Sequence, residues 1–131
     1  MIIGVGVDLC RVERIRRSLK VLGDHWISEI FTAEERRLCR LGADHALLFV
    51  RAFCDKEACF KALGTGRTAD VGWHDIEILQ YRLLASVRLS GGALQQLREI
   101  TPAGHASVLH IACADAAELA HAIVTISAVR L

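Results

Sequence analysis

Glu57 and Lys61 are the residues whose types and spacing point most directly to chemistry. They stand four apart in residues 53–66, which read as the last turns of a helix and a loop, so both project from one helix face within about 6 Å. Gly64 is expected to end the helix, because glycine accepts the left-handed conformation that closes a C-terminus. Gly64, Thr65 and Gly66 then offer backbone N–H groups that no large side chain shields. A carboxylate, an ammonium group and a bare loop suit a phosphate held through a metal ion; the alternative is an ordinary ion pair on a solvated helix.

Asp8 is the second candidate, and it follows the short apolar run of residues 1–7. The β-branched residues of this run predict a buried strand. A helical period begins at Leu9, so Asp8 is expected at the end of the strand, where chain ends and ligands meet. Asp8 can also serve as the N-cap of the following helix, although Arg11 stands where a capping-box glutamate is found.

Five segments extend this pattern along the chain: IGVGVD at 3–8, FTAEE at 31–35, DKEACFKALGTG at 55–66, WHDIE at 73–77 and HAS at 105–107. In this order and spacing they resemble the holo-[acyl-carrier-protein] synthase family, the short single-domain type of 4′-phosphopantetheinyl transferase. The resemblance runs from residue 2 to about residue 126 and so covers nearly the whole chain. The GVD element alone is weak, but the KEA…KALGTG element at the expected distance makes the match specific.

The resemblance implies an activity. Members transfer the 4′-phosphopantetheine arm of coenzyme A to a serine of an apo acyl carrier protein, release 3′,5′-ADP and depend on Mg²⁺. Asp8 and Glu57 are the expected metal ligands, since hard carboxylates suit Mg²⁺. Lys61 is expected to stabilise the bridging phosphate region or the departing nucleotide. The base that takes the serine proton stays open between a metal-bound water and Glu57.

Cofactor binding is assigned to Lys61, to the loop of Gly64, Thr65 and Gly66, and to His105. The resemblance places His105 at the first histidine of an HVSxSH element that contacts the cofactor region. A lone histidine on an apolar strand is otherwise a hydrogen-bonded structural residue, and this alternative is kept.

A single domain fits the length of 131 residues, of which 53% are apolar. The mean hydropathy of +0.34 is high for a small soluble monomer, so part of the apolar surplus is expected at a subunit interface. No apolar run approaches the roughly 20 residues of a membrane span, and no secretory signal is expected. Five cysteines without a CxxC pair indicate buried thiols in a reducing cytoplasm, and their spacing predicts no zinc site.

Hydrophobic periodicity predicts an α+β fold, with an antiparallel sheet packed against a long helix and shorter helices. The long helix is expected over residues 44–63, and Thr32 with Glu35 forms a capping box at the start of another. The remaining elements are helices over residues 11–22 and 93–99, strands over 74–80, 82–89, 105–111 and 119–128, and an acidic turn around Asp115.

Positive charge gathers on the first predicted helix, although the net charge is only +1. Such a helix is either a solvated surface or a surface that steers an acidic protein partner. The resemblance favours the second, because acyl carrier proteins present an acidic helix and members dock it through this region; Arg14 matches, with Arg11 and Arg17 beside it. Low aromatic content argues against nucleic acid. The resemblance also implies a homotrimer.

Some positions depart from the family pattern. Ala52 stands where an arginine is common, and Arg51 lies one position earlier, about 100° around a helix. Leu109 replaces a serine, and Asp55 adds an acid where alanine is usual. A second hypothesis is therefore a non-catalytic relative that binds carrier protein or coenzyme A without turnover.

Overall fold

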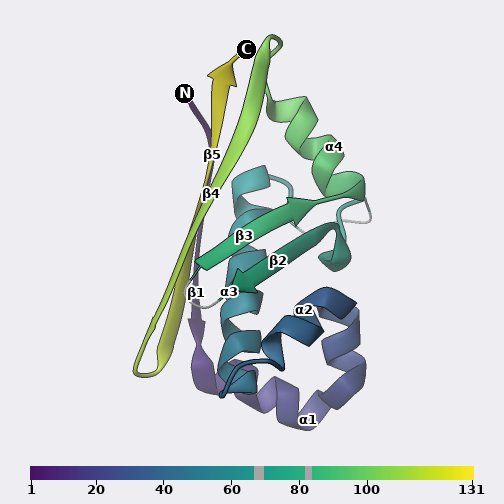
Figure 1. Cartoon of the computed structure of the whole chain (residues 1–131), viewed down its shortest axis with the longest axis vertical. Helices are drawn as coiled ribbons and strands as arrows, with labels where there is room; N and C mark the ends of the chain where they lie inside the picture. Colours follow the sequence, from purple (N-terminus) through teal and green to yellow (C-terminus); the bar gives the residue numbers. More distant parts are fainter. Residues whose placement is uncertain (67–69, 82–83) are drawn as a thin grey trace.

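The chain folds as a single α+β domain in which antiparallel strands flank one long central helix (Figure 1). The structure, a computed structural model, describes residues 1–66, 70–81 and 84–131. The elements are β1 (Ile2–Arg11), α1 (Val12–Ile30), α2 (Ala33–Cys39), α3 (His45–Leu63), the 3₁₀ turn η1 (Trp73–Asp75), β2 (Ile76–Tyr81), β3 (Leu84–Leu89), α4 (Gly91–Ile100), β4 (His105–Ala116) and β5 (Leu119–Arg130).

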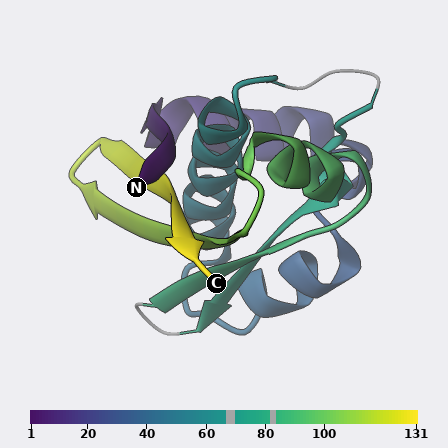
Figure 2. The same ribbon diagram turned by 90° about the horizontal axis from the view of Figure 1, so that it is seen from above.

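Two antiparallel sheets are present in the described part of the chain. The larger has the strand order β1-β5-β4, and the smaller is the β2–β3 pair. Figures 1 and 2 show that the helices α1 to α4 and the β2–β3 pair lie on one side of the larger sheet, with α3 against it. Among the described residues, no helix or further strand covers the other face of this sheet.

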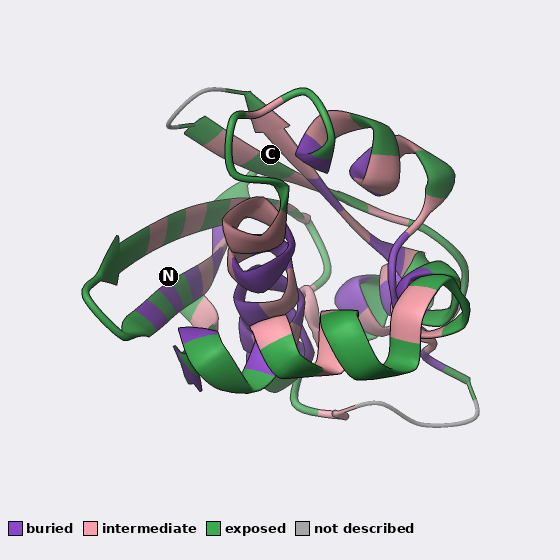
Figure 3. Cartoon of the chain, turned by 90° about the horizontal axis from the view of Figure 1, so that it is seen from below, coloured by how far each residue is buried: buried purple, intermediate pink, exposed green. Residues whose placement is uncertain are grey.

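Side-chain alternation along β5 separates a core face from an outer face. Its inward residues Ala120, Ala122, Val124, Ile126 and Ala128 are all buried, and the residues between them are exposed or half-buried. Figure 3 shows this alternation as stripes along the strands, whereas α3 is mostly buried. The small alanines of β5 let α3 approach the sheet closely.

Two glycines of β1 fix how closely α3 packs on the strand. A Cβ atom on Gly6 would lie 1.9 Å from the Ala58 carbonyl oxygen, and one on Gly4 would lie 2.4 Å from that of Ala62. No side chain fits at either position, because both contacts are with backbone. Residues 4, 6 and 8 share one face of the strand, so the contact also sets Asp8 against α3.

A buried ion pair ties α2 and α3 to β2. Lys56 Nζ lies 2.6 Å from Glu35 Oε1, both side chains are fully buried, and Lys56 also donates to the Ile76 carbonyl. Glu35 Oε2 accepts from the backbone N–H of Ile78 at 2.9 Å. The predicted capping box of Thr32 and Glu35 is confirmed, so Glu35 serves the helix start and the core at once. These hydrogen bonds satisfy charges that burial would otherwise make costly.

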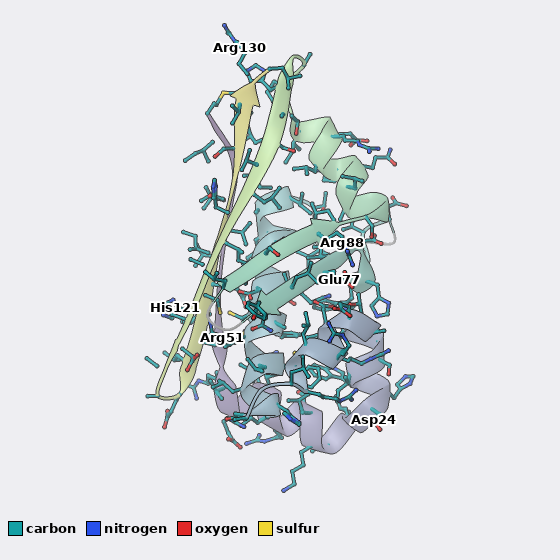
Figure 4. The ribbon with its side chains drawn as sticks, viewed as in Figure 1. Asp24, Arg51, Glu77, Arg88, His121 and Arg130 are labelled. Atoms are coloured by element: carbon teal, nitrogen blue, oxygen red, sulfur yellow. The ribbon has the colours of Figure 1, made fainter. Side chains whose placement is uncertain are left out.

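The smaller sheet is linked to α2 through a second acid. Thr32 Oγ1 donates to Glu77 of β2 at 2.6 Å, and Arg88 on the neighbouring strand β3 pairs with the same carboxylate (Figure 4).

Among the described residues, no helix is both long enough and apolar enough to span a membrane.

The predicted elements are recovered with two notable shifts at the start of the chain. β1 continues to Arg11 and is exposed on one face, so Asp8 lies inside the strand and not at its end. The N-cap of α1 is Arg11, which rules out the capping role considered for Asp8. The first helix reaches Ile30 through a break at Gly23, whose φ of 66° explains why the helical pattern ended near residue 22.

Smaller shifts occur later. The β2 strand begins at Ile76, because His74 belongs to the 3₁₀ turn. Residues 82 and 83, where the next strand was predicted to begin, lie outside the described residues. The closing turn falls at Ala117 and not around Asp115, since β4 and β5 pair as far as Ala116 and Leu119. The αL conformation predicted for Gly64 at the end of the long helix is confirmed, with φ of 80° and ψ of 0°.

Candidate active site

Asp8 and Lys61 meet where β1 crosses the last turn of α3. Lys61 Nζ lies 2.9 Å from Asp8 Oδ1 and also donates to the Val7 carbonyl oxygen at 3.0 Å. The Asp8 side chain is only 12% exposed, whereas that of Lys61 is 52% exposed. The carboxylate is therefore held at the floor of the site, and the ammonium group lies at its mouth with room to move.

Glu57 stands one helical turn before Lys61 on α3 and is half-buried. The pKa of Lys61 is raised, first by its hydrogen bond to Asp8, with smaller contributions from the negative charges of Asp8 and Glu57. The structure thus brings all three predicted residues into one electrostatic unit, in which two acids act on one cation.

The second oxygen of Asp8 also has a partner. Cys10 Sγ donates to Asp8 Oδ2 at 2.9 Å from two residues further along β1. Sequence reasoning missed this contact, because the helical period assigned from Leu9 onward placed Cys10 outside the strand. The i, i+2 spacing would have identified it once β1 was extended, since residues 8 and 10 of a strand share a face.

The glycine loop follows directly after Lys61 and has open space around it. Gly64 and Gly66 have φ of 80° and 61°, and a Cβ at either position would meet nothing within 4 Å. One of the predicted N–H donors is already used, because the Gly64 N–H bonds to the Lys61 carbonyl oxygen at 3.1 Å. The Thr65 hydroxyl donates to the Gly66 carbonyl oxygen.

A polar hollow of about 690 Å³ adjoins this loop. It lies between the loop and α4, and it is lined by Thr65, Asp70, Val71, Gly92, Gln95, Gln96 and Glu99. Gln96 also holds the end of α3, since its amide donates to the Leu63 carbonyl oxygen at 3.0 Å. Amides and carboxylates suit hydrogen bonding to an uncharged polar group better than they suit a phosphate.

His105 is not brought to Asp8 within one chain. Asp8 pairs with Ala122, which pairs with Cys113 of β4, and His105 stands eight residues before Cys113 on that strand. At about 3.4 Å per residue, the separation along the sheet is about 27 Å. The ring of His105 bonds to the Ala103 carbonyl oxygen at 3.0 Å, which is the structural role kept as an alternative.

The basic residues of the first turns separate into two groups. Arg14 and Arg17 are exposed on α1, and Arg11 is exposed at the end of β1, one residue before the helix. Arg16 is instead engaged, since its guanidinium lies 2.9 Å from the Asp44 carboxylate. Arg11 also borders a hollow of about 600 Å³ that lies between the start of α1 and the β4–β5 turn.

Arg51 points away from the glycine loop. Its guanidinium lies 2.6 Å from Asp115 Oδ1 on β4, and it contacts the Cys113 carbonyl oxygen at 3.4 Å. The pair links the β4–β5 hairpin to α3. Within one chain, Arg51 therefore does not take the place of the arginine that is common at position 52, where this chain has alanine.

The donor set of the site fits a magnesium ion. Asp8 and Glu57 contribute carboxylate oxygens, which are the hard donors that Mg²⁺ prefers, and Lys61 holds a positive charge beside them. A lysine that bonds a metal ligand through an exposed side chain can be displaced by a cation without any change in the fold.

The sequence is similar to proteins of one family along nearly its whole length. A family model described as the 4′-phosphopantetheinyl transferase superfamily matches residues 4–121. The holo-[acyl-carrier-protein] synthase of Methylobacterium nodulans is 45% identical over 129 residues, which are 98% of both chains. That of Dinoroseobacter shibae is 36% identical over 132 residues, covering 100% of this chain and 95% of the relative.

Solved structures give the same result for the fold. The holo-[acyl-carrier-protein] synthase of Neisseria meningitidis matches with a TM-score of 0.83 and 26% identity, over 97% of this chain and 99% of that one. The holo-(acyl-carrier-protein) synthase of Bacillus anthracis, solved in complex with CoA (3′,5′-ADP), matches with a TM-score of 0.73 and 26% identity, over 96% of both chains.

Proposed function

The chain belongs to the 4′-phosphopantetheinyl transferase superfamily, and we propose that it is a holo-[acyl-carrier-protein] synthase. In the proposed reaction, the serine oxygen of an apo acyl carrier protein bonds to the β-phosphorus of coenzyme A. The bridging oxygen bond of the pyrophosphate breaks, 3′,5′-ADP leaves, and the serine proton passes to a base. The observation that carries the proposal is the contact of Asp8 with Lys61, with Glu57 one turn away.

Asp8 and Glu57 are the residues proposed to hold Mg²⁺. When bound, the ion would neutralise the negative charge that develops on the phosphate oxygens. Asp8 needs no rearrangement of its backbone for this role, because the contact of Gly6 with Ala58 already fixes the strand against α3. The small exposure of Asp8 keeps water from competing for its oxygens.

Lys61 is proposed to act on the pyrophosphate. Its side chain is exposed and its pKa is raised by Asp8, so the ammonium group is charged at neutral pH. An arriving pyrophosphate offers this group a second anionic partner, and rotation of the lysine side chain would bring it toward the bridging oxygen. Preorganised positive charge at the point where negative charge develops is worth about 10²- to 10³-fold in rate.

The loop of Gly64, Thr65 and Gly66 is proposed to contact coenzyme A. The open space around both glycines allows backbone groups to approach the ligand. The amide-lined hollow beside the loop suits the polar, uncharged part of the nucleotide.

We further propose that the protein is a homotrimer. The outer face of the larger sheet exposes apolar side chains on all three strands: Val5, Val7, Leu9, Val108, Leu119, Ile123 and Val129. Such a face fits a subunit interface. His105 is about 27 Å along the sheet from Asp8 in one chain. It could join the site only if it came from a neighbouring copy.

The outer face also bears histidine. His121 of β5 lies on the side of the sheet away from the helices (Figure 4).

Sedimentation of the protein and of a Val7→Asp variant tests the assembly. A trimer that dissociates in the variant supports the proposal, and a wild-type monomer contradicts it.

Arg14, Arg17 and Arg11 are proposed to dock the acidic carrier protein. All three are exposed, in contrast to Arg16, which Asp44 engages. Arg14→Glu should raise KM for the carrier protein and leave KM for coenzyme A unchanged, because the charge lies outside the phosphate site. Equal effects on both values would contradict the assignment.

A reducing, cytoplasmic environment is supported by five free cysteines.

Mass spectrometry of the carrier tests the reaction directly. The protein is mixed with an apo carrier protein, coenzyme A and Mg²⁺, and the carrier should gain one phosphopantetheine while 3′,5′-ADP appears in equal amount. Chelation of the metal should stop the gain.

The alternative is a non-catalytic relative, motivated by Ala52 and Leu109, and the engagement of Arg51 with Asp115 is consistent with it. It predicts binding of coenzyme A with no mass gain on any of several carriers.

A further inference from the structure

Two thiols lie directly beneath Asp8, and the proposed reaction uses neither. Cys10 follows on β1, and Cys54 faces the strand from α3, where its Sγ lies 3.4 Å from the Asp8 carbonyl oxygen and 3.6 Å from that of Ala120. One oxygen of Asp8 and both sulfur atoms all lie within 4.8 Å of one another. Cys54 is fully buried and Cys10 is 8% exposed.

The fold holds this cluster in place from two directions. Asp8 and Cys10 share the inner face of β1, and Gly6 on the same face packs on Ala58, one turn after Cys54 on α3. The three donors therefore come from a rigid strand and a rigid helix. The Asp8 carboxylate, at 12% exposure, connects the buried thiols with the mouth of the site.

We propose that Asp8, Cys10 and Cys54 bind a thiophilic divalent cation of the zinc class. Tetrahedral zinc with bonds of about 2.3 Å to sulfur separates two sulfur ligands by about 3.8 Å, which is inside the 4.8 Å that bounds these donors. A sulfur and an oxygen ligand would lie about 3.5 Å apart, so Cys10 Sγ and Asp8 Oδ2, which are 2.9 Å apart, would have to separate slightly. Each thiol loses one proton to solvent when its sulfur bonds the metal, and no atom changes its oxidation state. Three protein ligands leave a fourth position for water.

The donor types distinguish this cation from magnesium. Thiolate selects zinc and related soft ions, whereas Mg²⁺ prefers oxygen alone. Asp8 belongs to both donor sets, so a zinc ion in the thiol cluster withdraws this carboxylate from the set shared with Glu57. Zinc should therefore inhibit the transferase in competition with magnesium, an expectation that rests on the proposed function.

Cobalt(II) is the probe that tests the site without reference to activity. The reduced, chelator-treated protein should bind one Co²⁺ per chain and develop the near-ultraviolet charge-transfer absorption of a cobalt–thiolate bond. Zn²⁺ should abolish this absorption in stoichiometric amount, whereas Mg²⁺ should weaken it only in large excess, because the two donor sets share Asp8 alone.

Matched cysteine variants locate the ligands. Cys54→Ala should weaken cobalt and zinc binding by more than the roughly 100-fold that loss of an outer-shell partner costs. Cys59→Ala should bind as the wild type does, although Cys59 lies on the same helix and is equally buried. If Cys54→Ala does not fold, Cys10→Ala decides, with the same expected loss.

The outcomes separate this proposal from the proposed function. A wild-type protein without the absorption, or Cys54→Ala and Cys10→Ala variants that keep it, would overturn the thiol site and leave the transferase untouched. Under the proposal, zinc at concentrations that abolish the cobalt absorption inhibits the wild type, and Cys54→Ala needs at least about 100-fold more zinc for the same inhibition.

Discussion

Replacing Asp55 by asparagine should change how the stability of the protein depends on pH. Asp55 is fully buried on α3, and neither carboxylate oxygen has a hydrogen-bond partner of good geometry among the described residues. Burial raises the pKa of Asp55 from 3.8 to about 7, while the Cys113 thiol and the Arg51 guanidinium pull it back and the charge of Glu35 raises it. The folded protein therefore binds a proton here that the unfolded chain has released.

The sign and size follow from this difference. The free energy of unfolding is highest when Asp55 is protonated in both states, and it falls as pH rises from about 4 through about 7. A shift from 3.8 to about 7 corresponds to about 4 kcal/mol in total. Between pH 5 and pH 8 the same two values give a loss of about 2.5 kcal/mol.

Urea unfolding at fixed protein concentration from pH 5 to pH 8 measures this loss. Asp55→Asn has no titrating group at this position, so it should not show this loss. Relative to the wild type, the unfolding free energy of the variant should therefore increase by about 2.5 kcal/mol from pH 5 to pH 8. Asp24→Asn, which removes an exposed acid from α1, controls for loss of charge alone. Parallel pH profiles for wild type and Asp55→Asn would refute the reasoning.

Three further variants test the packing and the site. Gly6→Ala should lower the unfolding free energy and the transfer rate together, because its Cβ would lie 1.9 Å from a backbone oxygen. Gly72→Ala is the control and should be tolerated, because the space around Gly72 is open. Equal unfolding curves for the two variants would contradict this. Lys56→Met should cost about 3–5 kcal/mol by leaving its buried carboxylate partner unpaired. Arg37→Met, which breaks an exposed pair, should cost at most about 1 kcal/mol, and similar urea midpoints for both would refute the contrast. Lys61→Met should reduce kcat about 10²- to 10³-fold with an unchanged unfolding curve, and full activity would remove its role.

The sequence predicted the secondary-structure positions of the candidate residues correctly on α3 and less well on β1. Glu57, Lys61 and Gly64 were placed correctly, because an i, i+4 pair followed by glycine has one geometric interpretation on a helix. Asp8 was set at a strand end, since Leu9 to Ile15 also fits a helical period. Pairing with β5 overrides that local pattern and extends β1 to Arg11.

Features that depend on contacts between distant elements could not be predicted. Glu35 and Lys56 are 21 residues apart, and only the packing of α2 on α3 brings their charges together. The thiol cluster is a similar case. Metal-binding cysteines are found from sequence when both stand on one short segment, whereas Cys10 and Cys54 converge from a strand and a helix.

The position of His105 reflects a different limit. Its place at the start of β4 was predictable from the strand pattern, and its large separation from Asp8 follows from the antiparallel register. A sequence motif orders residues along the chain, but it does not state how far apart the fold places them.

A double-mutant cycle on Asp8 and Glu57 tests most directly whether these acids serve one metal ion. The measurement is the initial rate of phosphopantetheine transfer to an apo carrier protein for the wild type, Asp8→Ala, Glu57→Ala and the double variant. If both carboxylates hold the same ion, each single variant loses most of the rate and the double variant loses little more. Losses that multiply independently, or full activity in either single variant, would contradict the shared site.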